Sequence, residues 1–449
     1  MLQTIVNAWK IAELRKKLLY TALIVLIFRI GSAIPVPFTD IAESGVLGAA
    51  ATTGNTFLNY LNMMTGDAFN YGTIFAMSIT PYINSSIIMQ LLAVAIPALE
   101  RLQKEGEEGR KKIATITRFV TIALGVLQST AYYFYLRSQG YLTDVTGVGF
   151  EILQALVIIL CFTGGTALIM WLGERINEKG IGNGISIILF AGIVSRIPSL
   201  IASLLGPNTG YISRGGAYIP ITLIISICMI LMIAFIVWMD NAERRIPVQY
   251  AKRVVGRKMY GGQSTHIPIK VNMSGVMPVI FASSILSLPP TIQMFMNTST
   301  VEENGFLKGF FAIFQMDHWA YSIIYFVFII AFAYFYASIQ YNPVEMSKNI
   351  RDNGGSIPGI RPGEPTSKYI GKILHRITLL GALLLSVVAL FPIIYSQVAA
   401  FILEQLGRTE GFTVSLGGTS IIILVGVALE TVKQLESQMM MRHYKGFLD

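Results

Sequence analysis

Apolar runs long enough to cross a bilayer recur along this chain, and they constrain its fold more than any other feature. A spanning helix needs ~20 mostly apolar residues, and ten segments qualify. They cover residues 18–34, 74–97, 113–136, 151–172, 184–204, 218–239, 273–296, 318–341, 371–395 and 419–436. Only 13% of the residues are charged, about half the share of an ordinary soluble protein. The sequence therefore predicts one all-α, polytopic membrane domain.

The first apolar run follows a basic segment, as the apolar core of a secretory signal peptide does. This run is longer than a typical signal core, and Pro35 and Pro37 stand where a cleavage site would lie. Nine further spans follow it. We therefore interpret it as an uncleaved first helix.

Basic residues are distributed unequally between the two sets of alternate connectors. Of the 34 Lys and Arg residues, 26 fall on the side that carries both termini and 5 on the opposite side. The positive-inside rule assigns the basic side to the cytoplasm. Both termini are therefore expected in the cytoplasm, as an even number of spans requires.

The connector between the sixth and seventh spans, about residues 240–272, is the most basic. Its core reads "YAKRVVGRKMYGGQSTHIPIKVN", and the alternation of valines with a Gly pair predicts a hairpin. The basic residues of interest are Arg244, Arg245, Lys252, Arg253, Arg257 and Lys258. Two interpretations remain open here: the charge only holds the loop inside, or it forms a docking surface.

The connector between the eighth and ninth spans, residues 341–370, is also long. Asn342 and Pro343 are typical of a helix start, and Gly354 of its end. Several prolines and glycines after it, up to Pro365, predict an irregular, stiff turn that presents Arg361. A stiff loop loses little entropy on binding, which suits docking, although a solvated arginine is a common alternative.

Two spans carry polar side chains that mark either helix contacts or a pathway. In the second span these are Thr80, Asn84, Ser85, Ser86 and Gln90, and in the seventh Ser274, Ser283, Ser284 and Ser287. Interhelical hydrogen bonds explain either set alone. Both sets together, next to long basic loops, favour a polar seam between the two spans.

The residues and motifs that the sequence lacks exclude several classes of membrane protein. No carboxylate or histidine lies near the middle of a span, whereas ion-coupled transporters usually have one there. The nucleotide-binding G-x-x-x-x-G-K-[ST] motif is absent. Cys161 and Cys228, each inside a span, support neither a disulfide framework nor a metal site. A passive pore or a scaffold without enzymatic activity or cofactor is expected.

Five blocks of sequence are specific enough to suggest a family. They read "KEGEEGRKKI", "WLGERINEKGIGNGISIILFAGIV", "YAKRVVGRKMYGGQSTHIPIKVNMSGVMPVIFASSI", "GIRPGEPTSKYI" and "GGTSIII". In this order they make the chain resemble the SecY family, the channel subunits of bacterial protein translocation, over essentially its whole length. The resemblance implies ten helices in two inverted five-helix halves around a central hourglass pore. The halves would be residues 1–204 and 218–449, with an external hinge at 205–217.

The resemblance also implies site residues, which composition could not have selected. The pore ring maps to Ile83, Ile87, Leu189, Ile193, Ile280 and Ile423, with a leucine where isoleucine is usual. A plug at about 57–66 maps to Phe57, Leu58, Tyr60, Leu61, Met63 and Met64. The lateral gate between the second and seventh spans maps to Asn84, Ile88, Gln90, Ser283, Ser284 and Ser287.

For the basic loops, the resemblance implies docking of the SecA ATPase or of the ribosome, whose RNA is a polyanion. Further implied partners are small SecE-like and SecG-like membrane subunits, signal peptides, nascent chains and membrane lipids of the bacterial plasma membrane. Two rivals remain: a secondary transporter or lipid flippase, which would need a charged or substrate-shaped midplane site, and an insertase scaffold without a through-pore.

Overall fold

The computed structural model describes most of the chain. The described residues are 2–41, 62, 65–143, 147–206, 213, 218–250, 253–255, 258–260, 264–293, 305–314, 318–405 and 418–445. The helices as far as residue 205 are α1 (Leu2–Lys10), α2 (Ala12–Gly31), α5 (Thr80–Ala95), α6 (Pro97–Lys104), α7 (Glu107–Ser138), α8 (Val148–Lys179), α9 (Gly184–Val194) and α10 (Ile197–Leu205).

The remainder of the chain adds eight described helices and five short strands. The helices are α11 (Tyr218–Asn241), α12 (Met277–Leu286), α13 (Leu288–Gln293), α15 (Gly305–Ile313), α16 (Trp319–Gln340), α17 (Pro343–Asp352), α18 (Glu364–Gln405) and α19 (Gly418–Lys445). The strands are β1 (Glu243–Tyr250), β2 (Arg253–Val255), β3 (Lys258–Tyr260), β4 (Ser264–Lys270) and β5 (Gly355–Ser356).

Every predicted span overlaps a helix, although the number of spans stays a prediction. Among the described residues, seven helices are long and apolar enough to cross a membrane, or eight if the bent pair α5–α6 counts as one span. The other two predicted spans correspond to α2, which starts within the basic segment, and to α12–α13, which is shorter. The all-α, polytopic fold class is confirmed.

Proline positions explain several helix boundaries. Pro81 lies in the first turn of α5, and the chain bends by 105° between α5 and α6, where Pro97 begins the new helix. Pro365 was expected to lie in an irregular turn, but this was wrong, because α18 begins at Glu364. The first turn of a helix tolerates proline, since the missing N–H has no partner there anyway.

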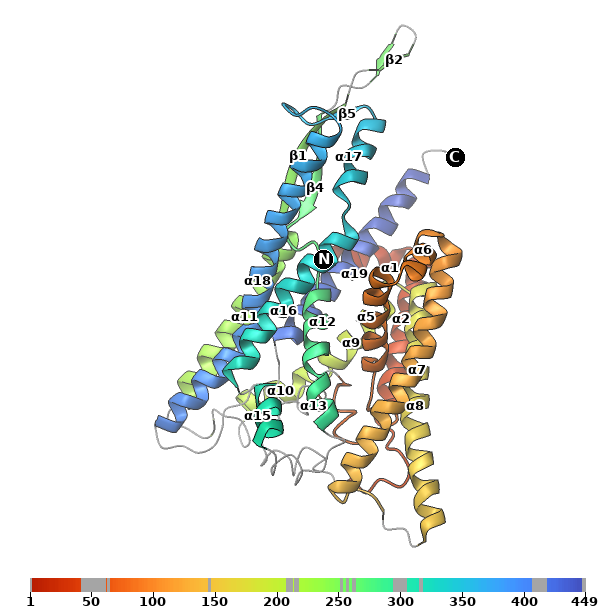
Figure 1. Ribbon diagram of the computed structural model, residues 1–449, viewed down its shortest axis with the longest axis vertical. Coiled ribbons are helices and arrows are strands. Elements are labelled where there is room, and N and C mark those ends of the chain that lie inside the picture. The colour runs from red at the N-terminus through yellow and green to blue at the C-terminus, as the bar shows by residue number, and fades with distance from the viewer. Residues whose placement is uncertain are drawn as a thin grey trace.

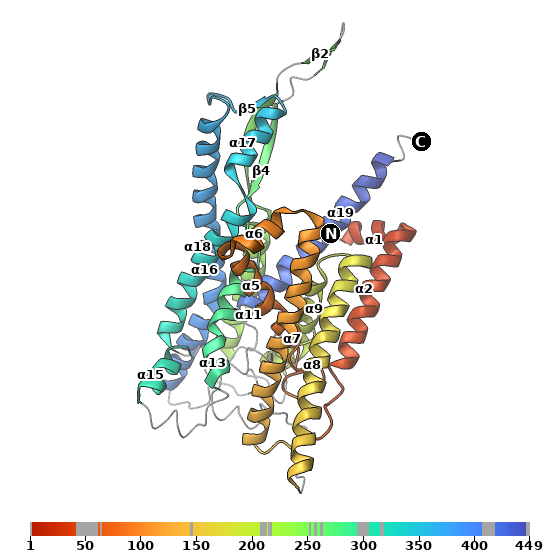
Figure 2. The same ribbon diagram turned by 45° about the vertical axis from the view of Figure 1, so that its right-hand side comes forward.

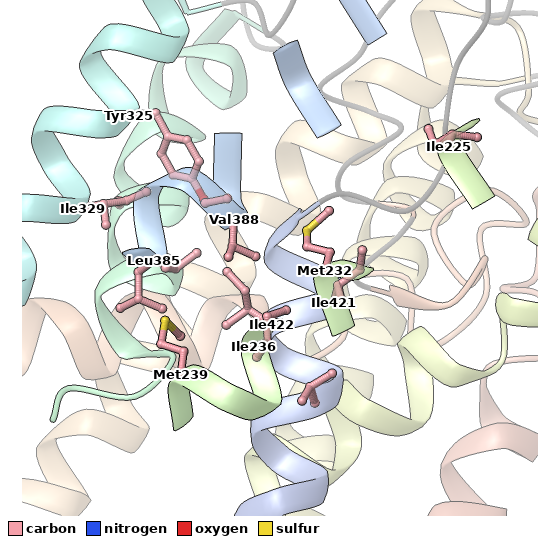
Figure 3. Packing of buried hydrophobic residues seen from close by; sticks show 14 of the residues in the cluster. Ile225, Met232, Ile236, Met239, Tyr325, Ile329, Leu385, Val388, Ile421 and Ile422 are labelled. Atoms are coloured by element: carbon pink, nitrogen blue, oxygen red, sulfur yellow. The ribbon is translucent and has the colours of Figure 1, made fainter. Parts of the chain in front are cut away.

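The helices separate into two groups in space. In Figure 1, α2, α5, α7 and α8 lie on the right, whereas α11, α16 and α18 lie on the left, with α12 beside α5 between them. A buried core unites α11, α12, α16, α18 and α19, and Figure 3 shows its side chains, among them Ile236, Tyr325 and Leu385. A second core joins α2, α5, α8 and α9 to α12 and α19, so it bridges the two groups.

A small extension at one end of the molecule combines β1, β4 and β5 with α17 and the first part of α18 (Figures 1 and 2). Strand β1 pairs antiparallel with β4, with Ile246 opposite Ile267, and also with β5. This confirms the hairpin predicted for the most basic connector. Its own buried core includes Ile246, Val248, Ile350 and Leu374 from β1, α17 and α18. Helix α17 is capped as predicted, because the Val344 N–H donates to the Asn342 side chain.

Candidate functional site

The six apolar residues assigned to the ring converge in one buried cluster. Two come from α5 (Ile83 and Ile87), two from α9 (Leu189 and Ile193), one from α12 (Ile280) and one from α19 (Ile423). The exposed fraction of each side chain lies between 0 and 9%. Residues four apart share one helix face, so α5 and α9 each present two members to the same place. The structure therefore brings together all six residues from four helices.

Local packing fixes how α9 presents its two members. The helix starts at Gly184, whose preceding residue Asn183 accepts a hydrogen bond from the Ile185 N–H through its side chain. A Cβ built on Gly184 would lie 1.9 Å from the Gly173 carbonyl oxygen of α8. The two helices therefore contact through their backbones, which leaves α9 little freedom to slide. This seats Leu189 and Ile193 in the cluster.

A constriction of this composition has a specific physical property. Branched aliphatic side chains offer no hydrogen bonds, so water leaves a narrow opening that they line, and ions do not cross it. The same side chains change rotamer at small cost compared with breaking a polar network. A packed aliphatic ring can thus seal a membrane and still part around an extended polypeptide.

Residues assigned to the lateral gate come from α5 (Asn84, Ile88 and Gln90) and from α12 and its end (Ser283, Ser284 and Ser287), and the two helices are in contact. Among the described residues, the serines bond within their own helix: Ser283 Oγ donates to the Ile280 carbonyl and Ser287 Oγ to the Ser284 carbonyl. Gln90 Nε2 donates to Ser86 Oγ on α5 itself, at 3.3 Å. Asn84 is buried, and its Oδ1 accepts no hydrogen bond from the described residues.

Separation of α5 from α12 would therefore break none of these hydrogen bonds. Ile88, the apolar member of the set, is 37% exposed.

A small, mostly apolar cavity of about 40 Å³ lies beside this contact. Five polar residues contribute to its lining, namely Thr65, Thr80 at the start of α5, Gln128 of α7, Ser287 and Thr291. A cavity of this volume has room for about two water molecules. Sequence reasoning missed Thr65, Gln128 and Thr291. A glutamine inside an otherwise apolar span was the signal available for Gln128.

The residues assigned to the plug, Phe57, Leu58, Tyr60, Leu61, Met63 and Met64, lie outside the described residues. The described residues next to them, Asn62 and 65–72, form a hydrogen-bonded turn. Asn62 Nδ2 donates to Asp67 Oδ1 at 2.8 Å, and the Asn70 N–H donates to Asn62 Oδ1 at 3.0 Å. This turn, called the outer turn below, contacts the end of α9.

The basic docking residues divide into described and undescribed positions. Arg244 and Arg245 are exposed on β1, where Arg245 Nε lies 2.7 Å from Glu243 Oε1. Arg253 and Lys258 belong to the paired strands β2 and β3, whereas Lys252 and Arg257 lie outside the described residues. Arg361 is exposed on the turn before α18, and its carbonyl accepts a hydrogen bond from Thr366 Oγ1.

The two basic loops form a single structure, which sequence reasoning missed. Strand β5, from the loop that carries Arg361, pairs with β1 through Gln249 opposite Ser356. Ile357 and Ile350 then pack in the core of the extension with Ile246. The charges of both loops consequently project from one rigid platform. A two-residue strand has no periodicity that a sequence pattern could have revealed.

Comparisons with known proteins agree with this architecture. The family model SecY matches residues 73–432. The chain is 42% identical to a protein translocase subunit SecY of Streptomyces galbus over 459 residues and 41% identical to that of Mycobacterium tuberculosis over 459 residues; each alignment covers 100% of both chains. The chain is 40% identical to the Corynebacterium glutamicum subunit over 460 residues.

Solved structures share the fold at low sequence identity. One, described as a protein-conducting channel, has a TM-score of 0.59 at 20% identity and covers 94% of this chain and 92% of its own. Sec61 in a canine ribosome–channel complex has a TM-score of 0.55 at 18% identity, with the same coverage.

Proposed function

The chain belongs to the SecY family, and on that premise we propose that it is the channel subunit of a bacterial protein translocase. In this role it conducts unfolded secretory polypeptides across the plasma membrane and releases membrane-protein segments sideways into the lipid. The observation that carries the proposal is the convergence of six branched aliphatic side chains, from four helices, in one buried cluster.

The ring is assigned the role of a seal. In the idle channel its side chains pack against one another, so neither water nor ions cross. A translocating chain displaces them, and their contact with the chain keeps the surrounding gap small. Ile83, Ile280 and Ile423 lie on three different helices, so opening requires these helices to move apart.

The contact between α5 and α12 is assigned the role of lateral gate. The hydrogen bonds of Gln90, Ser283 and Ser287 stay within their own helices, and Asn84 Oδ1 accepts none from the described residues, which supports a contact that separates without leaving new unpaired groups. The small cavity beside this contact, lined in part by Thr80, Gln128 and Ser287, has room for water. Signal peptides and membrane segments would leave through this contact.

We infer no enzymatic role for the chain itself, and the driving force must then come from a partner. The extension that carries Arg244, Arg245 and Arg361 is the docking platform for SecA or the ribosome, because exposed basic residues on a rigid support suit an anionic partner. SecE-like and SecG-like subunits, nascent chains and membrane lipids complete the set of partners.

The platform is placed in the cytoplasm together with both termini. The charge distribution between connectors supports this orientation. In both ribbon views, α1, the end of α19 and the extension lie toward the same end of the molecule, opposite α13 and α15.

Crosslinking of a stalled chain tests the central proposal. Cysteines replacing Ile87 and Ile280 are expected to crosslink to a precursor arrested in the channel of the reconstituted complex. Cysteines at Leu160 on α8 and Ile230 on α11, which are 60% and 69% exposed, serve as controls away from the gate. If the control positions react with the precursor and the two ring positions do not, the ring assignment is wrong.

A further inference from the structure

An ion-pair cluster connects the outer turn to the end of α9, close to the ring. Arg196 Nη2 lies 3.2 Å from Asp67 Oδ1, and the Arg196 side chain is 16% exposed. A second arginine, Arg29 of α2, donates through Nη1 to the Gly66 carbonyl at 3.4 Å. Nothing in the sequence pattern marked these residues as partners, since they lie far apart in the chain.

Backbone packing brings the outer turn directly against α9. Gly66 has a φ of +65°, and a Cβ built there would lie 2.8 Å from the Gly192 carbonyl oxygen and 2.9 Å from Ser195 Oγ. Asp67 itself has a φ of +72°, a left-handed conformation that aspartate and asparagine tolerate better than most residues. The turn is therefore shaped to present the Asp67 carboxylate to Arg196.

A short hydrogen-bond path links this cluster to the ring. The Arg196 N–H donates to the carbonyl of the ring residue Ile193 at 3.1 Å. Ser195 Oγ donates to the Gly192 carbonyl at 2.6 Å. A shift of Arg196 would thus move the last turn of α9, which carries Ile193. Leu189, one turn earlier on the same helix, would move with it.

We propose that Arg196 and Asp67 form a positioning clamp that holds the ring residues of α9 in their packed arrangement. The inference rests on the proposed sealing function of the ring and adds residues to which that function assigns no role. Arg29 supports the clamp by holding the backbone of Gly66 next to the carboxylate.

An ion pair suits this place better than an apolar contact would. In the packed channel the pair is partly buried, with the Arg196 side chain 16% and the Asp67 side chain 33% exposed, so the two charges attract one another more strongly than they would in water. When the channel fills with water and polypeptide, water solvates both charges, and an exposed pair of this kind contributes little. An apolar contact would instead resist hydration. The clamp therefore holds the packed ring and releases readily once water enters.

Resting ion conductance of the reconstituted complex in planar bilayers tests the clamp. The main variant is Asp67→Asn, because asparagine keeps the shape of the side chain and tolerates the same φ. We expect Asp67→Asn and Arg196→Gln each to raise the resting conductance about tenfold, which corresponds to ~1.4 kcal/mol in the packing equilibrium. The double variant should conduct no more than the leakier single variant, because the pair acts as one unit.

Matched controls separate the clamp from general effects of charge and folding. Arg137 and Glu151 form another ion pair of 3.2 Å, but both are about half exposed, so Arg137→Gln should leave the resting conductance unchanged. Translocation of a normal precursor by every variant at the wild-type rate shows that the complex is intact. A structural role alone would lower yield and translocation together without raising conductance, and that result would overturn the clamp.

A ring variant makes the two proposals distinguishable. Ile193→Ser should conduct at rest if the ring is the seal. If Ile193→Ser raises the resting conductance while Asp67→Asn and Arg196→Gln leave it unchanged, the clamp is wrong and the ring assignment is supported. If Ile193→Ser also leaves the resting conductance unchanged, the proposed sealing function is wrong, and the clamp, which rests on it, is wrong too. The clamp is also wrong if the fold-increases in conductance of the two single variants multiply in the double variant, because independent sites behave in that way.

Discussion

The ring and the proposed docking platform are two regions of the molecule with opposite physical properties. The ring is buried, uncharged and assembled from four helices, whereas the platform is exposed, basic and assembled from two loops. A change in the ring is expected to alter packing and the proposed seal together, because its side chains belong to one buried cluster. A change in a platform charge alters an encounter with a partner and leaves the fold intact, because water already solvates that charge.

The largest effect is expected in the ring itself. Ile87→Ser removes a side chain that is 3% exposed and brings a hydroxyl into an aliphatic cluster, which we expect to cost ~2–5 kcal/mol of stability and to open a resting ion conductance. Leu160→Ser on α8, at a position 60% exposed, should do neither. Bilayer conductance and thermal unfolding of the purified complex measure both effects. Equal behaviour of the two variants would contradict the assigned difference between ring and lipid face.

The next effect is expected in the core under the platform. Val248 is completely buried in the extension, so Val248→Asp places an unpaired charge there and should disorder the strands, at a cost of about 3 kcal/mol or more. Binding of SecA and of ribosomes should be lost while the resting conductance stays at the wild-type level. Gln249→Asp, one residue along and exposed, is the matched control. A leak in the Val248 variant would show that platform and ring are not separable.

A smaller structural effect but a clear binding effect is expected from charge reversal on the platform. Replacing Arg257, Lys258 and Arg361 by Glu should change stability by less than ~0.5 kcal/mol, because these are loop charges. Binding of SecA or ribosomes should weaken, since repulsion replaces attraction.

For the wild-type protein, ribosome binding should fall steeply with salt concentration. Sedimentation with ribosomes at several salt concentrations measures this dependence. Arg361, on its proline-bounded turn, should contribute more per charge than Lys258. Normal binding and translocation by the triple variant would mean that the charge serves topology alone.

The smallest effect is expected from a labelling variant that only reports sidedness. Ser264→Cys lies at the start of β4 and should leave translocation unchanged. An impermeant thiol reagent should label it in inverted vesicles and not in intact cells, because the distribution of basic residues assigns the platform to the cytoplasm. Labelling from outside in intact cells would reverse the assigned orientation and remove the platform from the reach of any cytoplasmic motor.

Sequence patterns predicted the helices well and the extension partly. The hairpin of the basic connector and the cap at Asn342 were correct, because turn and cap preferences act over a few residues. The start of α18 was misjudged, because Pro365 fits a first turn as well as a loop. Whether the number of spans reaches ten depends on two segments, α2 and α12–α13. Charge in the first and short length in the second weaken the hydropathy pattern of a spanning helix.

Sequence alone determined the class of this protein, because bilayer thickness and the cost of burying charge act on each segment separately and leave a mark in its composition. Tertiary structure decided which apolar residues meet. Hydropathy does not distinguish Ile87 from Ile88, yet Ile87 is buried in the cluster of the ring and Ile88 is 37% exposed. Tertiary structure also joined the two basic loops through β5 and brought Asp67 to Arg196. Such contacts depend on the relative positions of distant helices, and no local pattern of residues encodes them.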